Sequence, residues 1–185
     1  VARGAGSEKR RETLSASRHA WERVQVSRHP ERPKTQDYVE QVFTGVVELH
    51  GDRLFGDDAA MFAGLATIGG HRVVVLGHSK GRNTKENIAR NFGSPHPEGF
   101  RKAMRAMRLA DRFGLPIVSL LDTAGAYPGI EDAERGQALA IARCLATLAE
   151  GRAPVLVVGI GDGCSGGCSA VRIRERLLTT RQAPL

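Results

Sequence analysis

The stretch at residues 161–169, GDGCSGGCS, carries spacings that match three different kinds of chemical site. Gly161, Gly163 and Gly166 form a G-x-G-x-x-G pattern, in which a glycine-rich turn lets a pyrophosphate approach the backbone at a helix N-terminus. Ser165 stands at the centre of a G-x-S-x-G pattern, which places a nucleophilic serine on a sharp turn between a strand and a helix. The glycines also suggest a phosphate-binding loop.

Each of these sites needs partner residues that the chain does not supply. The dinucleotide pattern requires an acidic residue about 20 positions further on, and only Glu175, within an arginine cluster, follows Gly166. A serine hydrolase requires an acid and a histidine, and no Asp or His follows Ser165. A phosphate loop requires Lys and then Ser or Thr, where this chain has Gly167 and Cys168. What remains is a set of backbone N–H groups at a helix start, which form either an oxyanion site or only a tight turn.

The elements that must hold these glycines follow from hydrophobic periodicity. Apolar runs at 116–122 and 154–160 predict strands buried on both faces, and a helix is predicted between them at 133–149. Strand, helix and strand with short connections predict a parallel α/β arrangement. Upstream, the spacing predicts a helix over 35–49, a hairpin of strands at 61–68 and 71–78, and a helix over 100–113 with solvated arginines on its outer face.

The net charge of +7 lies at the two ends of the chain. Residues 1–36 hold nine Lys or Arg and four Asp or Glu, residues 171–185 hold four and one, and the residues between them hold 14 and 15. A nucleic-acid-binding domain carries its basic face on the folded part with aromatic residues interleaved, and only 5% of this chain is aromatic. We therefore expect no nucleic-acid partner.

Composition indicates a cytoplasmic globular protein. The chain is 41% hydrophobic over 185 residues, which is enough for one buried core, and no apolar run approaches the roughly 20 residues of a membrane span. Cys144, Cys164 and Cys168 lack a paired metal-binding spacing, so we expect reduced thiols and no metal site. The expected organisation is a basic arm at 1–34, a core at 35–170 and a basic tail at 171–185. Within the arm, Leu14, Trp21 and Val24 stand at helical spacing and predict a helix whose apolar side docks elsewhere on the protein.

Five segments between about Ala20 and Gly167 match one family of proteins in content and in order. They are AWERVQVSRHPERPKTQDYVEQVF, ELHGDRLFGDD, GHSKGRNTKENIARNFGSPHPEGFRKAMRAM, DTAGAYPGIEDAERGQALAIA and GIGDGCSGG. Together they resemble the α subunits of bacterial acetyl-coenzyme A carboxylase carboxyltransferase. The resemblance implies an α/β fold of the ClpP/crotonase spiral type with parallel strands. It also implies transfer of a carboxyl group from carboxybiotin to acetyl-CoA, which gives malonyl-CoA for fatty-acid synthesis.

The resemblance also implies which residues act on the substrate. In the family, paired glycines of the α subunit form an oxyanion hole for the biotin carbonyl, and these map onto Gly166 and Gly167, with the amide of Cys168 as a further donor. Backbone N–H groups can carry this chemistry alone, because the loss of one oxyanion donor typically lowers the rate by about 10²–10³. No side-chain nucleophile is then required, in agreement with the missing acid and histidine after Ser165.

Two further motifs supply candidate substrate-binding residues. The family motif DTPGAYPG stands here as DTAGAYPG at residues 122–129, with Ala124 in place of a proline, and it implies roles for Gly125, Tyr127 and Gly129. Lys80 and Arg82 lie in a polar segment, where long basic side chains either meet a substrate carboxylate or phosphate or serve the structure alone.

The resemblance implies an α2β2 assembly. The β subunit would supply the second oxyanion hole, most of the CoA site and the zinc of the complex. Carboxybiotin would arrive on a separate biotin carboxyl carrier protein, so no cofactor is bound covalently to this chain. ATP binding is expected only at the level of the complex, in a separate biotin carboxylase. The expected ligands are acetyl-CoA and malonyl-CoA, with no membrane contact.

The chain departs from the family after Gly167. Residues 171–185, VRIRERLLTTRQAPL, place arginines at alternate positions, so we expect them to be exposed or loosely held as a short surface helix, and not to build the next turn of the spiral. A frameshift, a premature stop or a naturally shortened subunit would explain such an end and leave the fold incomplete. Two other functions stay open: a related acyl-CoA carboxyltransferase or decarboxylase component of secondary metabolism, and a non-catalytic pseudo-subunit that binds β.

Overall fold

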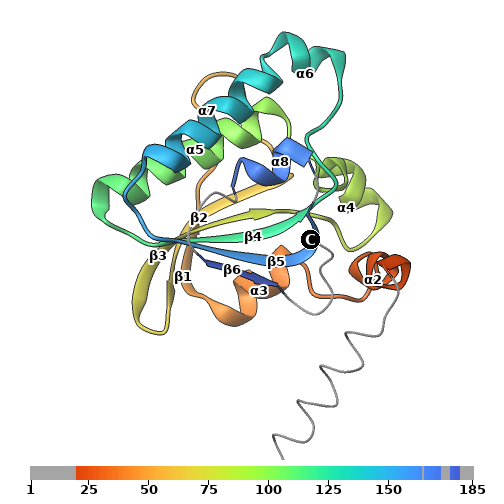
Figure 1. The fold of residues 1–185 in the computed structure, drawn as a ribbon, viewed down its shortest axis with the longest axis horizontal. Helices are drawn as coiled ribbons and strands as arrows, with labels where there is room; N and C mark the ends of the chain where they lie inside the picture. The colour runs from red at the N-terminus through yellow and green to blue at the C-terminus, as the bar shows by residue number, and fades with distance from the viewer. Residues whose placement is uncertain (1–19, 164, 172–175, 180–185) are drawn as a thin grey trace, which may run out of the picture.

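The computed structural model describes residues 20–163, 165–171 and 176–179, which form one sheet with helices on both faces (Figure 1). The sheet order is β1-β2-β3-β4-β5-β6; the first three strands are antiparallel neighbours and β3 to β6 run parallel. The strands are β1 (Thr44–Glu48), β2 (Met61–Ile68), β3 (His71–His78), β4 (Ile117–Thr123), β5 (Val155–Gly163) and β6 (Arg176–Thr179). The helices are α2 (Ala20–Ser27), α3 (Thr35–Val42), α4 (Thr84–Ala89), the 3₁₀ turn η1 (Asn91–Gly93), α5 (Pro97–Phe113), α6 (Ile130–Glu134), α7 (Gln137–Glu150) and α8 (Ser165–Ser169).

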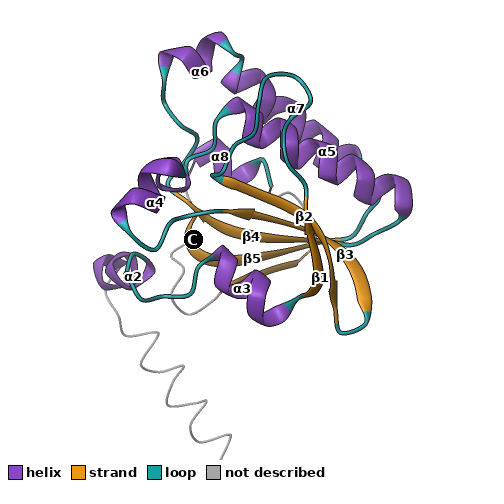
Figure 2. Ribbon diagram, turned by 180° about the vertical axis from the view of Figure 1, so that it is seen from behind, coloured by secondary structure: helices purple, strands orange, loops and turns teal. Residues whose placement is uncertain are grey.

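Two apolar layers hold the helices on the sheet. Helices α5 and α7 cover one face, and α3 lies on the other (Figures 1 and 2). Helix α5 begins with Pro97 at its first position and ends before Gly114, whose φ of 62° is the left-handed conformation that favours glycine after a helix. Its Phe100 and Met107 are buried against the sheet, which confirms the predicted helix and its apolar face. Among the described helices, none is long and apolar enough to cross a bilayer.

The hairpin of β2 and β3 is confirmed. Ile68 pairs with His71, and the two residues between them, Gly69 and Gly70, have φ of 54° and 83°. Two consecutive residues with positive φ fit the turn that connects two twisted strands most tightly, and glycine takes this conformation without strain. The strands predicted at 116–122 and 154–160 are also confirmed as β4 and β5.

The helix predicted over residues 35–49 is wrong in its second half. Helix α3 ends at Val42, Phe43 is extended, and residues Thr44–Glu48 form β1, which pairs with β2. Val46 and Val47 are β-branched and favour a strand when a neighbouring strand is available. The helix predicted at 133–149 is interrupted near its start, where Gly136, with φ of 83°, separates the two helices α6 and α7.

The prediction for the chain after residue 170 is also wrong where the structure describes it. Val171 is fully buried, and residues 176–179 form β6, parallel to β5, rather than a surface helix. Pairing with β5 satisfies the backbone groups on one edge of this segment, and the charge pattern alone does not predict such pairing. Residues 172–175 and 180–185 lie outside the described residues.

The N-terminal helix is confirmed at Ala20–Ser27, although its contact with the core differs from a hydrophobic docking. Trp21 is 66% exposed, and Leu14 lies outside the described residues. Instead the buried Ser27 donates a hydrogen bond to Asp162 of β5 at 3.1 Å. The connection between α2 and α3, residues 28–34, is hereafter called the strap.

Candidate functional site

The two glycine motifs meet at the carboxyl ends of the parallel strands. A Cβ atom on Gly167 would lie 2.7 Å from the Ala126 nitrogen and 3.1 Å from the Gly125 carbonyl carbon, so only glycine permits this approach. Gly166 is exposed, and a Cβ atom there would lie 3.8 Å from Ile141, which is ordinary contact. The structure thus brings Gly125, Gly166 and Gly167 together at the edge where α/β proteins commonly bind ligands.

Helix α8 presents its first turn at this place. The Ala170 N–H donates to the Gly166 carbonyl at 3.0 Å, while the N–H groups of Gly166 and Gly167 stand in the first turn and have no carbonyl one turn back within the helix. The Cys168 side chain is buried, with 1% of its surface exposed. The chemistry available here is therefore that of backbone donors.

The turn after β4 packs directly against Gly167. The hydroxyl of the buried Thr123 accepts a hydrogen bond from the Gly125 N–H at 3.0 Å and donates one to the Gly125 carbonyl at 2.9 Å. Gly125 has φ of 147°, a conformation that other residues rarely adopt. The turn is fixed by these bonds although Ala124 replaces the expected proline.

A buried ionic cluster lies at the ends of β4 and β5, next to the glycine turn. Asp122 is fully buried, forms an ion pair with Arg32 of the strap, and binds the Lys80 ammonium at 2.9 Å. A Cβ atom on Gly161 would lie 2.2 Å from the Asp122 carboxylate and 2.6 Å from the Arg32 guanidinium. Gly161 is therefore required by the space that this ion pair occupies, and not by a bound dinucleotide.

Asp162 extends the cluster to the surface. It pairs with Lys80 at 3.2 Å and with Arg28 at 3.5 Å, besides its bond to Ser27. Burial opposes ionisation of this carboxyl, but the Lys80 charge and hydrogen bond, with Arg28 and Ser27, outweigh it and lower the pKa of Asp162. Asp162 is thus an anionic anchor that ties the strap and the end of α2 to β5.

The strap covers a cavity of about 410 Å³ that we call the strap cavity. Ala124 and Phe92 form part of its wall, so it adjoins the glycine turn. Lys80 and Arg82, both predicted as substrate-binding residues, lie in this same cavity. Its wall holds five cations: Arg28, Arg32, Lys34, Lys80 and Arg82.

His78, at the end of β3, is completely buried next to the backbone of α8, the short helix that carries Gly166 and Gly167. Burial lowers the pKa of its imidazole to about 4, against the opposing effects of Asp122 and the neighbouring backbone of Gly167 and Leu120. Neither ring nitrogen makes an aligned hydrogen bond among the described residues. The ring is therefore neutral at neutral pH, packed against the backbone that carries Gly167.

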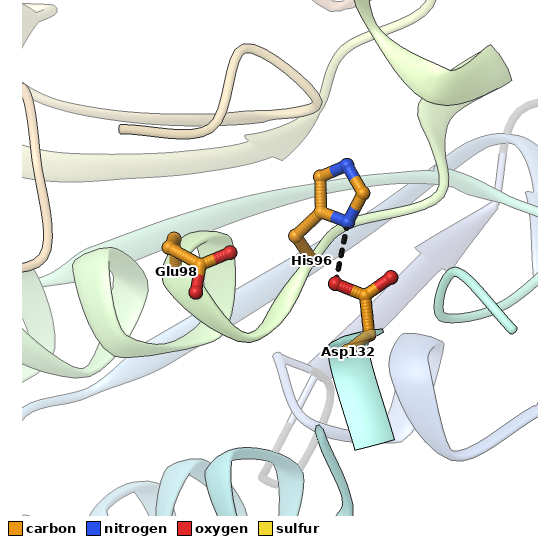
Figure 3. A group of neighbouring side chains, drawn as sticks. All are labelled: His96, Glu98 and Asp132. Atoms are coloured by element: carbon orange, nitrogen blue, oxygen red, sulfur yellow. Dashed lines mark hydrogen bonds and ion pairs between the residues drawn. The ribbon is translucent and has the colours of Figure 1, made fainter. Parts of the chain in front are cut away.

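Tyr127 and Gly129 belong to a separate cluster. Tyr127 packs on His96 with ring centroids 4.8 Å apart, and a Cβ atom on Gly129 would lie 2.9 Å from the tyrosine ring. His96 Nδ1 lies 2.8 Å from a carboxylate oxygen of the buried Asp132 (Figure 3). These two predicted residues thus shape the loop before α6, where they lie against each other and against His96 and Asp132.

His96, Glu98 and Asp132 lie close enough together to act as metal ligands (Figure 3). Cations of the chain already neutralise the two carboxylates. Arg101 binds Glu98 at 2.7 Å, and Arg135 binds both Glu98, at 3.0 Å, and Asp132. A divalent cation would have to displace both guanidinium groups. The prediction of solvated arginines on α5 is wrong for Arg101 for the same reason, since its side chain is only 14% exposed.

Two of the three cysteines are described, and both are buried. The Cys144 thiol lies 3.3 Å from the Ala170 carbonyl oxygen, and burial raises the pKa of this thiol to about 12. A thiol of this kind is unreactive at neutral pH. Cys164 lies outside the described residues.

Sequence reasoning missed the strap. Arg32 and Lys34 were assigned to the basic arm, outside the core, yet both are buried at the carboxyl ends of the strands. One signal was present: β4 and β5 each carry an aspartate near their ends, and parallel strands bring such ends to one edge. Two buried carboxylates side by side require cations from elsewhere in the chain.

The arrangement of the sheet and its helices defines the class of the fold, the crotonase type. Solved structures with this arrangement include the β subunit of P. aeruginosa geranyl-CoA carboxylase, with a TM-score of 0.62 at 20% identity over 77% of this chain and 25% of that one. Transcarboxylase 12S has a TM-score of 0.64 at 18% identity over 76% of this chain and 26% of that one. The predicted fold class is confirmed.

The chain belongs to the acetyl co-enzyme A carboxylase carboxyltransferase-like family, whose model matches residues 5–184. The acetyl-coenzyme A carboxylase carboxyl transferase subunit alpha of Halorhodospira halophila is 54% identical over 92% of this chain and 54% of its own length. That of Methylococcus capsulatus is 55% identical over 93% of this chain and 54% of its own. The chain therefore spans about half the length of these relatives, and the family match continues past Gly167, where sequence inspection placed its end.

Proposed function

We propose that this chain acts as the carboxyltransferase α subunit of acetyl-CoA carboxylase, in transfer of a carboxyl group from carboxybiotin to acetyl-CoA. The family membership and the relatives at 54% and 55% identity support the reaction class. The observation that carries the proposal is the contact between Gly167 and the Gly125–Ala126 turn, which presents first-turn N–H groups at the carboxyl edge of the sheet.

The residues present fit a biotin group held by its carbonyl oxygen, because the exposed Gly166 leaves the space in front of the donors without a side chain. Bound carboxybiotin supplies a carboxyl group whose release leaves negative charge on the ureido carbonyl oxygen. The N–H groups of Gly166 and Gly167 stabilise that charge without any proton transfer from a side chain. The hydrogen bonds between Thr123 and Gly125 hold the turn after β4 in place.

Lys80 serves this site in two ways. Its ammonium is shared between Asp122 and Asp162, which fixes it at the boundary between the strap cavity and the strand ends. There, with Arg82, it borders the cavity that would receive the anionic part of a substrate. The β subunit supplies the second oxyanion hole and most of the CoA site in this proposal, with zinc on β and biotin on a carrier protein.

The reverse reaction tests this function. The α subunit is combined with β, and the conversion of malonyl-CoA to acetyl-CoA is followed with and without free biotin as the carboxyl acceptor. We expect conversion that requires both β and biotin. A marked preference for another acyl group, such as methylmalonyl-CoA, would favour the related carboxyltransferase of secondary metabolism. Stable assembly with β and no turnover would favour the pseudo-subunit.

A further inference from the structure

All but one of the cations that line the strap cavity form an ion pair with a carboxylate of the described residues. Four of the five make an ion pair with an aspartate of the core or of α3. These pairs are Arg28 with Asp162, Arg32 with Asp122, Lys80 with both of those aspartates, and Arg82 with Asp37. A lining whose charges were all matched would have no electrostatic preference for an anion.

Lys34 is the exception. Only 8% of the surface of Lys34 is exposed, and its ammonium donates a hydrogen bond to the Gly81 carbonyl. Within the described part of the chain it makes no ion pair, although Asp37, Asp122 and Glu86 stand near enough to influence it. Burial, and then the charge of Arg32, lower the pKa of Lys34 against those acids. A buried ammonium in this position gains most from an anion that enters the cavity.

Phe92 provides an apolar contact in the same cavity. Its ring is 58% exposed, and it stands between Asn91 and Gly93 in a run of three residues with φ of 46°, 54° and 77°. Left-handed backbone at two consecutive residues other than glycine is costly and is found mostly where a ligand or a catalytic group requires it. The cavity therefore offers a cation and an exposed ring to one ligand.

We propose that the strap cavity is a binding site for a carboxylate group, with Lys34 as the cation that receives it. The five cations of the lining stand against four carboxylates, Asp37, Glu40, Asp122 and Asp162, which leaves one net positive charge for one entering carboxylate group. Because Ala124 borders both the cavity and the glycine turn, the carboxylate belongs either to an acyl-CoA whose other end reaches that turn or to a small free carboxylate. The first source rests on the proposed function, and the second does not.

The site is tested by binding to this 185-residue chain, with malonate, inorganic phosphate, acetyl-CoA and malonyl-CoA as probes. Titration calorimetry gives the affinities, and the ¹⁵N resonance of the Lys34 ammonium reports its protonation. We expect Lys34→Met to weaken malonate binding by about ten- to a hundredfold, the loss of one charge-assisted hydrogen bond. Malonate should also raise the pKa of Lys34 in the wild-type chain.

Two variants serve as controls. Arg28→Met removes a cavity cation that is 60% exposed and matched by Asp162, and it should change malonate affinity by less than about threefold. Lys34→Arg keeps the charge and should retain most of the affinity. Equal malonate binding by wild type and Lys34→Met would overturn the proposal, as would Lys34-dependent binding of phosphate without Lys34-dependent binding of malonate.

The acyl-CoA probes distinguish a carboxylate that belongs to an acyl-CoA from a small free carboxylate. Malonyl-CoA that binds more tightly than acetyl-CoA, in wild type but not in Lys34→Met, identifies the substrate carboxylate. A Lys34-dependent affinity for malonate alone identifies a free carboxylate and supports the site without the proposed function. Absence of carboxyl transfer together with Lys34-dependent binding would count against the function only, whereas transfer without such binding would count against the site only.

Discussion

At the scale of single residues, several glycines are explained by what lies next to them. Gly161 and Gly163 fit a dinucleotide fingerprint, yet Gly161 faces the buried pair of Asp122 and Arg32. Gly167 faces the Gly125 turn, and Gly166 faces open space beside Ile141. Within this one glycine-rich stretch, Gly161 is thus required by an ion pair, Gly167 by backbone packing, and Gly166 leaves open space.

Gly161→Ala should destabilise the fold by about 2–4 kcal/mol. The new methyl group would stand 2.2 Å from the Asp122 carboxylate, and a buried ion pair that loses its geometry leaves uncompensated charge. Urea unfolding measures the difference, and Gly166→Ala, with ordinary contact at 3.8 Å, is the matched control. A Gly161→Ala variant as stable as the control would show that the pair does not fix this glycine.

His78 should make stability depend on pH in a mildly acidic range. Its pKa is about 4 in the folded chain and 6.5 in the unfolded chain, so between these values the unfolded state binds the additional proton. Stability from this residue is complete above pH 6.5 and falls by about 3 kcal/mol as the pH approaches 4. Unfolding at several pH values measures this loss.

Two variants isolate the histidine contribution. His78→Gln has no titrating group there, so its stability should decline less than that of wild type over the same range. His71→Gln removes an exposed histidine at the other end of the same strand and should keep the wild-type slope. Identical pH dependence in wild type and His78→Gln would contradict the assignment.

At the scale of elements, the ends of helices and strands are set by individual glycines. Gly114 closes α5 with φ of 62°, and a Cβ atom there would meet nothing within 4 Å. Gly114→Ala should therefore cost about 1 kcal/mol through backbone strain alone, and Gly114→Asn less, because asparagine tolerates this conformation. Thermal unfolding distinguishes the two, and equal stability of the Ala variant and wild type would contradict this account of the helix end.

Much of the fold could be predicted because it depends on local patterns. Gly69-Gly70 between two alternating runs determines the hairpin, and continuous apolar runs determine the buried strands β4 and β5. The failures occur where distant contacts decide. Val46 and Val47 fit a helix stripe or a strand, and only pairing with β2 selects β1. Residues 176–179 become a strand because β5 lies beside them.

The candidate site, like the fold, has a part that local motifs predict and a part that distant contacts decide. The glycine turn was predicted from motifs, and its two halves are in contact in the structure. The strap was not, because an ion pair between Arg32 and Asp122 joins residues that are 90 positions apart. No local pattern reports such a pair, although two strand-end aspartates indicate that a cation is needed.

At the scale of the whole molecule, three distant parts of the chain converge on one edge of the sheet. The strap contributes cations, the loop after β4 contributes a fixed turn, and the segment after β5 contributes backbone donors (Figure 1). The ionic cluster of Asp122 and Asp162 connects all three. We propose that the N–H groups of Gly166 and Gly167 stabilise negative charge during carboxyl transfer.

The most direct test compares Gly166→Pro with Gly166→Ala in the complex of this subunit with β. Proline removes the N–H group and is tolerated in the first turn of a helix, whereas alanine keeps the N–H group and has room. The measurement is biotin-dependent conversion of malonyl-CoA to acetyl-CoA, with assembly checked by sedimentation. The account predicts that Gly166→Pro loses about 10²–10³ in rate while Gly166→Ala stays within about tenfold of wild type. Equal rates for the two variants in intact complexes would contradict it.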